Sequence, residues 1–213
     1  TGKLKRLHKI ESIVSFIDLY DLIFIKKINS LKHQISFYGK FSKNINSKNT
    51  ISKLLDILDK NKLLNNQKFQ IKVKKNIPQQ AGLGGGSMNS ANILNYLEKK
   101  NFIKINQRQK IKISNLVGSD VILGFQSKNS IITSRGSIKR YSNCPKFYTL
   151  LVKPKFGCST KEIYSKVKKF SKSKYNNPKK FMFTQRYLST QENDLETVAF
   201  SIYPKLRELK NFL

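Results

Sequence analysis

A cluster of glycines near the middle of the chain has residue types and spacing that could do chemistry. Four glycines fall within five positions, in the run Gly82-Leu83-Gly84-Gly85-Gly86-Ser87. Glycine has no Cβ, so backbone N–H groups in such a loop can approach a phosphate closely. The following residues, 88–99, carry apolar side chains at helical spacing, which predicts that the loop opens a helix. The positive end of that helix would complete an anion site suited to the di- or triphosphate of a nucleotide.

Other interpretations of the glycine run explain less. A tight turn from strand to helix could need positive φ angles at one or two glycines, but hardly at four. No Gly-Lys-Ser or Gly-Lys-Thr follows, so the loop is not a Walker loop, and the Rossmann spacing fails because Ser87 holds its sixth position. Two common nucleotide-binding folds are therefore excluded.

The elements that must position this loop are a mixture of strands and helices. Strands are predicted as a pair joined by a turn within 10–28, and at 32–38, 69–75, 122–125, 130–133 and 148–153. Helices are predicted at 51–58, 88–99 and 107–117, with Asn49 or Thr50 as the cap of the first. The pattern breaks around 143–145, so we place a domain boundary near Pro145. Composition and pattern alone indicate only a mixed α and β protein.

The charge of the chain is strongly positive. The formal net charge is +30, from 42 Lys and Arg against 12 Asp and Glu. Such a balance suggests a polyanionic partner, but the lysines are spread along the whole length together with Asn and Ile, rather than gathered in one stripe. A solvated basic surface explains this pattern better than a nucleic-acid interface, and a positive field would also attract an anionic nucleotide substrate.

Cysteine content and hydropathy point to an ordinary cytoplasmic protein. Cys144 and Cys158 are the two cysteines, and they form neither a CxxC pair nor a set with histidines at ligand spacing, so we predict no disulfide framework and no metal-ligating residue. No apolar run is long enough to cross a membrane, and no signal-peptide segment follows residues 1–6. We expect a cytoplasmic location and no membrane partner.

The residues around the glycine loop resemble the second motif of the GHMP kinases. They read Ile77-Pro78-Gln79-Gln80-Ala81-Gly82-Leu83-Gly84-Gly85-Gly86-Ser87-Met88-Asn89-Ser90-Ala91. The triple glycine is similar to the diphosphocytidyl-methylerythritol kinase family within that superfamily. The chain departs from the family pattern at Met88, where a second serine is usual, and at Ser90, where an alanine is usual.

Four further stretches resemble the same family in the same order. They are His8 to Ser12 continuing through Phe16 to Asp21, then Gly118-Ser119-Asp120-Val121, then Lys153-Pro154 with Ser159, Thr160 and Tyr164, and finally Asn193 to Glu196. The resemblance therefore spans nearly the whole chain, which makes chance agreement at one loop a poor explanation.

The resemblance implies an α+β fold of two domains. Residues 1–145 would form the ATP-binding N-terminal domain, similar to the second domain of ribosomal protein S5, without its first strand. Residues 146–213 would form an incomplete, ferredoxin-like GHMP kinase C-terminal domain. The family's Lys-x-Asn strand would precede Thr1 and its C-terminal glycine motif would follow Leu213, so we expect the chain to be truncated at both ends and impaired as it stands.

The resemblance also implies an activity, which is ATP- and Mg²⁺-dependent phosphorylation of the 2-hydroxyl of a cytidine-diphosphate-linked methylerythritol, in non-mevalonate isoprenoid synthesis. Asp120 matches the family's catalytic aspartate and would accept the hydroxyl proton. Substrate binding would involve Asp120, His8 and Thr160, although Leu7 replaces the family's tyrosine beside His8. The residues that would bind the nucleotide are Pro78, Gly82, Leu83, Gly84, Gly85, Gly86, Ser87 and Asn89.

Several of these residues have simpler explanations when they are considered alone. Asp120 after Gly118 and Ser119 could cap a helix or fix a turn. Ser159 and Thr160 could shape the turn after Gly157. Asp18 and Asp21 fall among strand residues, where we expect both carboxylates to be exposed to solvent.

Two alternative functions stay open from the sequence. The first is another GHMP kinase acting on homoserine, mevalonate or a sugar, against which the triple glycine argues. The second is a basic nucleic-acid-binding module, which the charge and the S5-like fold would favour by analogy only.

Overall fold

The computed structural model describes residues 10–168 and 171–213, and divides them into two compact units. One unit comprises residues 18–127, and the other comprises the described residues up to 17 together with those from 128 onward. The division differs from the boundary near Pro145 that we predicted. The reason is strand pairing, because strand β1 (Ser12–Val14) and strand β6 (Ile138–Tyr141) both pair with β5 (Asn129–Ile132). The assignment of an ATP-binding and a C-terminal domain stays a prediction.

The unit of residues 18–127 is built on a three-stranded sheet in the order β2-β4-β3. Strand β2 (Leu22–Ile28) pairs antiparallel with β4 (Lys68–Lys74), and β3 (Gln34–Tyr38) pairs parallel with β4. A parallel pair needs a crossover, and helix α1 (Thr50–Lys60) supplies it between β3 and β4. The side chains alternate along each strand, so the sheet has one packed face and one exposed face.

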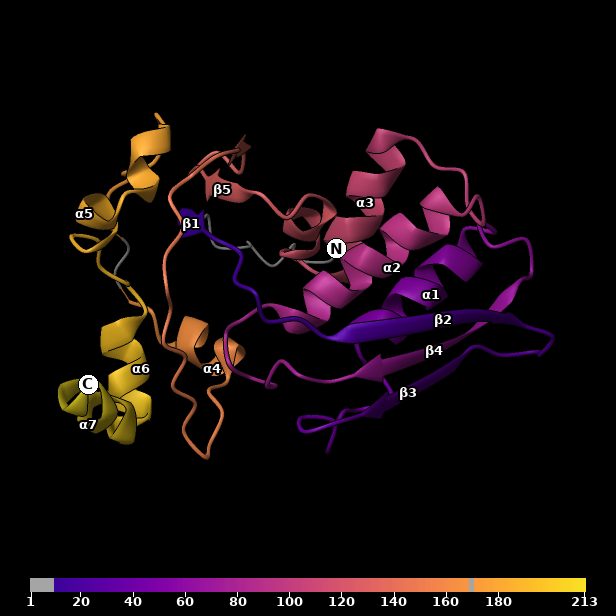
Figure 1. Ribbon diagram of the computed structural model, residues 1–213, viewed down its shortest axis with the longest axis horizontal. Helices are drawn as coiled ribbons and strands as arrows, with labels where there is room; N and C mark the ends of the chain where they lie inside the picture. Colours follow the sequence, from indigo (N-terminus) through magenta and orange to yellow (C-terminus); the bar gives the residue numbers. More distant parts are fainter. Residues whose placement is uncertain (1–9, 169–170) are drawn as a thin grey trace, which may run out of the picture. The chain divides into compact units, whose positions relative to one another are not determined.

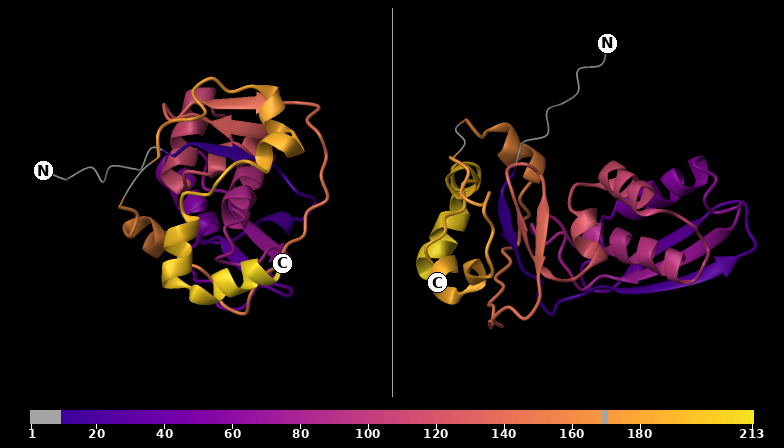
Figure 2. Two further views of the ribbon diagram at one scale, coloured as in Figure 1. Left: turned by 90° about the vertical axis from the view of Figure 1, so that its left-hand side faces the viewer. Right: turned by 90° about the horizontal axis from the view of Figure 1, so that it is seen from above.

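Three helices pack together over this sheet (Figure 1). They are α1, α2 (Gly85–Lys99) and α3 (Gln107–Val117), and Figure 2 shows them on the same side of the strands. The side chains of a single core fill the space between the two layers. Its most buried members include Ile51, Leu54, Leu55, Leu58, Phe69, Ile71, Val73, Ile93, Leu94 and Leu97. This core holds the start of α2 in a fixed relation to the end of β4.

Asparagine side chains set the beginning of two of these helices. Asn49 caps α1 by accepting from the N–H groups of Ile51 and Ser52, and Asn106 caps α3 by accepting from that of Gln109. Helix α2 differs, because its N-cap is Gly84, which has no side chain to offer. The first N–H groups of α2 are therefore left without a side-chain cap.

The described residues of the second unit form the sheet β1-β5-β6 and five short helical segments. The segments are α4 (Thr160–Ser165), the 3-10 helix η2 (Lys180–Phe183), α5 (Gln185–Leu188), α6 (Glu196–Ile202) and α7 (Pro204–Phe212). A small core of Ile131, Met182 and Phe183 joins the sheet to the helices. Among the described residues after 145 there is no strand, and the ferredoxin-like arrangement stays a prediction.

Three predicted features of secondary structure are wrong. Residues 122–125 lie in a 3-10 helix, η1 (Val121–Phe125), and residues 148–153 form no strand. The segments predicted as a hairpin within 10–28 are strands, but β1 and β2 pair with different partners in different units. The pairing of β1 and β2 depends on partners that are distant in sequence, which a local pattern does not report.

Candidate functional site

The glycine loop leads into α2, as predicted, and its geometry explains its composition. Gly82 and Gly84 adopt positive φ angles of 69° and 65°, which a residue with a Cβ rarely adopts. A Cβ added at Gly85 would lie 3.0 Å from Cγ2 of Ile77, and one at Gly86 would lie 3.1 Å from Oγ1 of Thr50. Two of the four glycines thus have a backbone conformation that favours glycine, and the other two leave little room for a Cβ.

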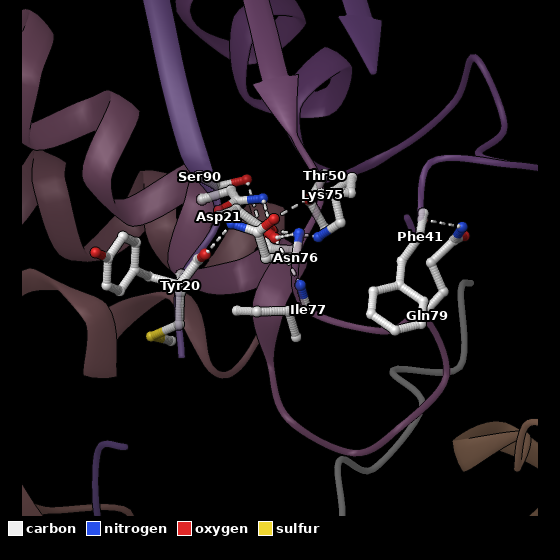
Figure 3. A network of polar contacts seen from close by, with 12 residues as sticks. Tyr20, Asp21, Phe41, Thr50, Lys75, Asn76, Ile77, Gln79 and Ser90 are labelled. Carbon is white, nitrogen blue, oxygen red and sulfur yellow. Dashed lines mark hydrogen bonds and ion pairs between the residues drawn. The ribbon is translucent and has the colours of Figure 1, made fainter. Parts of the chain in front are cut away.

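Neighbouring side chains hold the first turn of α2 in place. The Thr50 hydroxyl donates a hydrogen bond of 2.9 Å to the carbonyl oxygen of Gly86, and the Ser90 hydroxyl donates to the same oxygen at 3.1 Å. Gln79 reaches back across the loop and donates to the carbonyl oxygens of Phe41 and Lys43, at 3.1 and 2.7 Å. Figure 3 shows Gln79 beside Phe41, apart from the contacts around Asp21. The bonds to Gly86 hold the start of α2, whose first N–H groups have no side-chain cap and could therefore bind an anion.

The Gly118-Ser119-Asp120 element lies beside the start of α2. A Cβ added at Gly118 would be 3.7 Å from the Ser87 hydroxyl oxygen, so the two segments are in contact range. The following turn, η1, packs even closer, because a Cβ added at Gly124 would lie 2.7 Å from that of Ala91. The fold therefore brings together two motifs that are about thirty residues apart in sequence.

The Asp120 side chain does not cap a helix. It sits at the N-cap position of η1 without a side-chain capping bond, and its carboxylate is exposed. That carboxylate accepts a hydrogen bond of 3.1 Å from the Ser119 hydroxyl. The simpler explanation of Asp120 as a helix cap is therefore not supported, and an exposed carboxylate is free to meet a ligand.

The other predicted residues occupy varied positions. Pro78 and Leu83 are half-buried in the loop, and Ser87 is half-buried in the first turn of α2. Asn89 is 5% exposed and donates its amide to Asp21 at 2.8 Å, so its side chain faces the interior. Thr160 is exposed at the start of α4, in the other unit, where the Ser159 hydroxyl caps the helix by accepting from Glu162. His8 lies outside the described residues.

The prediction for Asp21 is wrong, whereas Asp18 is exposed as expected. The side chain of Asp21 has no exposed surface and forms an ion pair with Lys75. Burial raises the pKa of this carboxyl, but hydrogen bonds from Lys75, from the Ile77 and Asn76 N–H groups and from Asn89 outweigh it, so the pKa is lower than usual. The signal that could have found it is its place in the early family segment, directly before strand β2.

The oxygen chemistry of the site suits Mg²⁺ held largely by phosphates. Within residues 10–168 and 171–213, no group of three His, Cys, Asp or Glu side chains could hold a metal ion by itself. Mg²⁺ in phosphoryl-transfer sites keeps several waters and takes one or two protein oxygens beside those of the phosphates. The hydroxyl of Ser87 and the carboxylate of Asp120 are oxygen donors of that kind, next to the loop.

Comparisons with known proteins agree with this geometry. The family described as GHMP kinases N terminal domain matches residues 49–130. The chain is 55% identical over all 213 residues to the 4-diphosphocytidyl-2-C-methyl-D-erythritol kinase of Pelagibacter ubique, and spans 76% of that protein. It is 33% identical over 175 residues to the kinase of the same name from Fusobacterium nucleatum. That match covers 79% of this chain and 58% of that protein.

Two solved structures share the fold. A crystal structure of 4-(cytidine 5'-diphospho)-2C-methyl-D-erythritol kinase superposes with a TM-score of 0.61 and 19% identity, over 90% of this chain and 68% of that chain. A homoserine kinase from Cytophaga hutchinsonii superposes with a TM-score of 0.52 and 13% identity, over 71% and 52% of the two chains. At these identities, the likeness concerns the fold alone. No helix of the described residues is both long and apolar enough to cross a membrane.

Proposed function

Since the chain belongs to the 4-diphosphocytidyl-2-C-methyl-D-erythritol kinases of the GHMP kinase superfamily, we propose that it transfers the γ-phosphoryl group of ATP to the 2-hydroxyl of diphosphocytidyl-methylerythritol. The family assignment confirms the resemblance stated from the sequence, the α+β GHMP kinase fold and the use of ATP. The observation that carries the proposal is that α2 begins at a run of glycines and that no side chain caps its first N–H groups. These groups lie next to the Gly118–Asp120 element.

The chain's own residues supply binding and positioning. The N–H groups of Gly85, Gly86 and Ser87 point out of the start of α2 and would neutralise phosphate oxygens. Pro78, Gly82, Leu83 and Gly84 would shape the loop around them. The Ser87 hydroxyl and the Asp120 carboxylate could help to hold Mg²⁺, which when bound would neutralise charge that develops during transfer.

Asp120 is the proposed general base. The 2-hydroxyl oxygen forms a bond to the γ-phosphorus while the bond from that phosphorus to the β,γ-bridging oxygen breaks, and ADP leaves. The hydroxyl proton passes to the carboxylate of Asp120, whose exposed position supports the assignment. His8 and Thr160 remain proposed substrate-binding residues, and the S5-like and ferredoxin-like descriptions of the two domains belong to the same proposal.

The substrate is tested by competition between alcohols. The complete protein, with ATP and Mg²⁺, is offered diphosphocytidyl-methylerythritol beside homoserine and mevalonate, and the labelled product is identified. The proposal predicts phosphate on the first compound alone. Phosphate on homoserine or mevalonate would keep the superfamily and refute the substrate. Transfer to none, together with salt-sensitive binding of nucleic acid that ignores ATP, would refute the kinase assignment itself.

A further inference from the structure

The buried carboxylate of Asp21 contacts both ends of the glycine loop. Its Oδ1 accepts hydrogen bonds from the N–H groups of Asn76 at 2.8 Å and Ile77 at 2.9 Å, where the chain leaves β4 for the loop. Its Oδ2 accepts from the Lys75 ammonium and from the Asn89 amide, which lies one turn into α2. Figure 3 shows Asp21 at the centre of these contacts. Four donors thus converge on a single side chain. Three of them belong to residues before the loop, and one belongs to a residue after it.

We infer that Asp21 is a positioning residue, which fixes the glycine loop in its phosphate-binding conformation through Ile77 and Asn89. This inference rests on the proposed function, because it concerns nucleotide binding by the same loop. Asp21 itself cannot touch the nucleotide, since its side chain has no exposed surface.

The path from Asp21 to the phosphate-binding groups is short. Asp21 holds the backbone of Ile77, and the Ile77 side chain lies so close to Gly85 that a Cβ there would be only 3.0 Å away. Gly85 is the first residue of α2 and one of the proposed phosphate-binding positions. From the other side, Asn89 ties the second turn of the same helix to Asp21. A shift of either contact would move the N–H groups of the first turn, and small misplacements of preorganised groups are costly.

The ion pair with Asp21 also indicates what Lys75 does at this site. The Lys75 side chain is 6% exposed, and its ammonium pairs with Asp21, so it neutralises the carboxylate and is not available to a phosphate. Without this pairing, a buried negative charge near the loop would repel the nucleotide. Lys75 and Asp21 together therefore present a neutral support beneath the loop.

The test compares two asparagines on α2. Asn89→Ala removes one donor to Asp21, whereas Asn92→Ala, on an exposed position of the same helix, removes only a bond to the Met88 carbonyl oxygen. ATP affinity is measured by calorimetry on the complete protein, well below its unfolding temperature. We expect Asn89→Ala to weaken ATP binding about tenfold and Asn92→Ala to change it less than about twofold. A structural role alone would lower the folded fraction and the apparent kcat, but not the affinity of folded molecules.

A double-mutant cycle separates positioning from direct contact by Asn89. Asp21→Asn keeps the size of the side chain but removes its charge, and we expect it to weaken ATP binding at least as much as Asn89→Ala. The double variant should then bind ATP about as well as Asp21→Asn alone. Additive losses would show that Asn89 acts independently of Asp21 and would overturn the inference. If Asp21→Asn does not fold, unchanged ATP affinity in Asn89→Ala still overturns the inference, and direct contact is excluded because the Asn89 side chain is 5% exposed and donates to Asp21.

The outcomes distinguish the inference from the proposed function. Unchanged ATP affinity in Asn89→Ala overturns the inference, while the wild-type protein still phosphorylates its substrate. Failure of the wild-type protein to bind ATP overturns both. Wild-type binding of ATP without transfer to diphosphocytidyl-methylerythritol refutes only the proposed substrate, and the affinity ratios still decide the role of Asp21.

Discussion

The hydroxyl of Thr50, at the start of α1, donates a hydrogen bond of 2.9 Å to the carbonyl oxygen of Gly86, in the first turn of α2. The two residues are 36 positions apart, so this bond joins the crossover helix to the phosphate-binding loop. The same proximity leaves little room for a larger residue at position 86, since a Cβ there would lie 3.1 Å from the Thr50 hydroxyl oxygen.

Thr50→Val tests that bond, because valine keeps the shape of threonine without its hydroxyl. We expect a loss of about 1 kcal/mol in the free energy of unfolding and a several-fold weaker affinity for ATP. The Gly86 carbonyl oxygen retains its bond from Ser90, which limits the loss. Urea denaturation and calorimetry measure the two quantities. Thr50→Ser keeps the hydroxyl and serves as the control, so equal effects of Val and Ser would contradict this account.

Gly124→Ala tests the packing of η1 against α2. The new Cβ would lie 2.7 Å from that of Ala91 and 3.0 Å from the Met88 sulfur, which forces the two elements apart. We expect destabilisation of about 1–3 kcal/mol by thermal or urea unfolding, as for other overpacked cores. Adding Ala91→Gly removes the opposing methyl group and should recover part of the loss. A variant as stable as the wild type would mean that η1 is not packed in this way.

Stability should fall on mild acidification because of His33. Its Nδ1 accepts from the Phe69 N–H at 3.0 Å, which leaves Nε2 to donate to Asp59 at 3.2 Å. Burial lowers the pKa of His33, and Lys68 lowers it further, against the opposing effect of Asp59. The unfolded chain therefore binds a proton below about pH 6.5, before the folded protein does. The free energy of unfolding should decrease as the pH falls from 6.5 to the lowered pKa.

The measurement is the free energy of unfolding in urea at a series of pH values from 7.5 downward. His33→Gln removes the titrating group and should flatten this part of the profile, although it also lowers stability at neutral pH. Persistence of the same slope in His33→Gln would assign the effect to other groups.

Local sequence patterns predicted the elements of the glycine-loop unit well. Helix α3 has the predicted bounds, and α1 and β4 differ from theirs by a residue or two, because apolar periodicity and asparagine caps act over short distances. The secondary structure of residues 122–125 was harder to predict, since the same apolar run can form a strand or a short helix. Contact between Gly124 and Ala91 favours the compact turn, and that contact is not visible in a local window.

The candidate site was only partly predictable for a similar reason. The glycine run, Ser87 and Asp120 stand out by residue type and motif. Asp21 does not, because the burial of a carboxylate depends on donors such as Lys75 and Asn89, which are 54 and 68 positions away. A carboxylate among strand residues is usually exposed, and only the folded structure shows that this one is paired.

The most direct test of the account is the effect of Asp120→Asn on phosphoryl transfer in the complete protein. Asparagine keeps the size of the side chain and loses its basicity, and the exposed Asp18, changed to Asn, is the matched control. We predict that Asp120→Asn slows transfer to diphosphocytidyl-methylerythritol by about 10²–10⁴-fold, with ATP affinity nearly unchanged, while Asp18→Asn alters neither. Near-normal turnover by Asp120→Asn would contradict it.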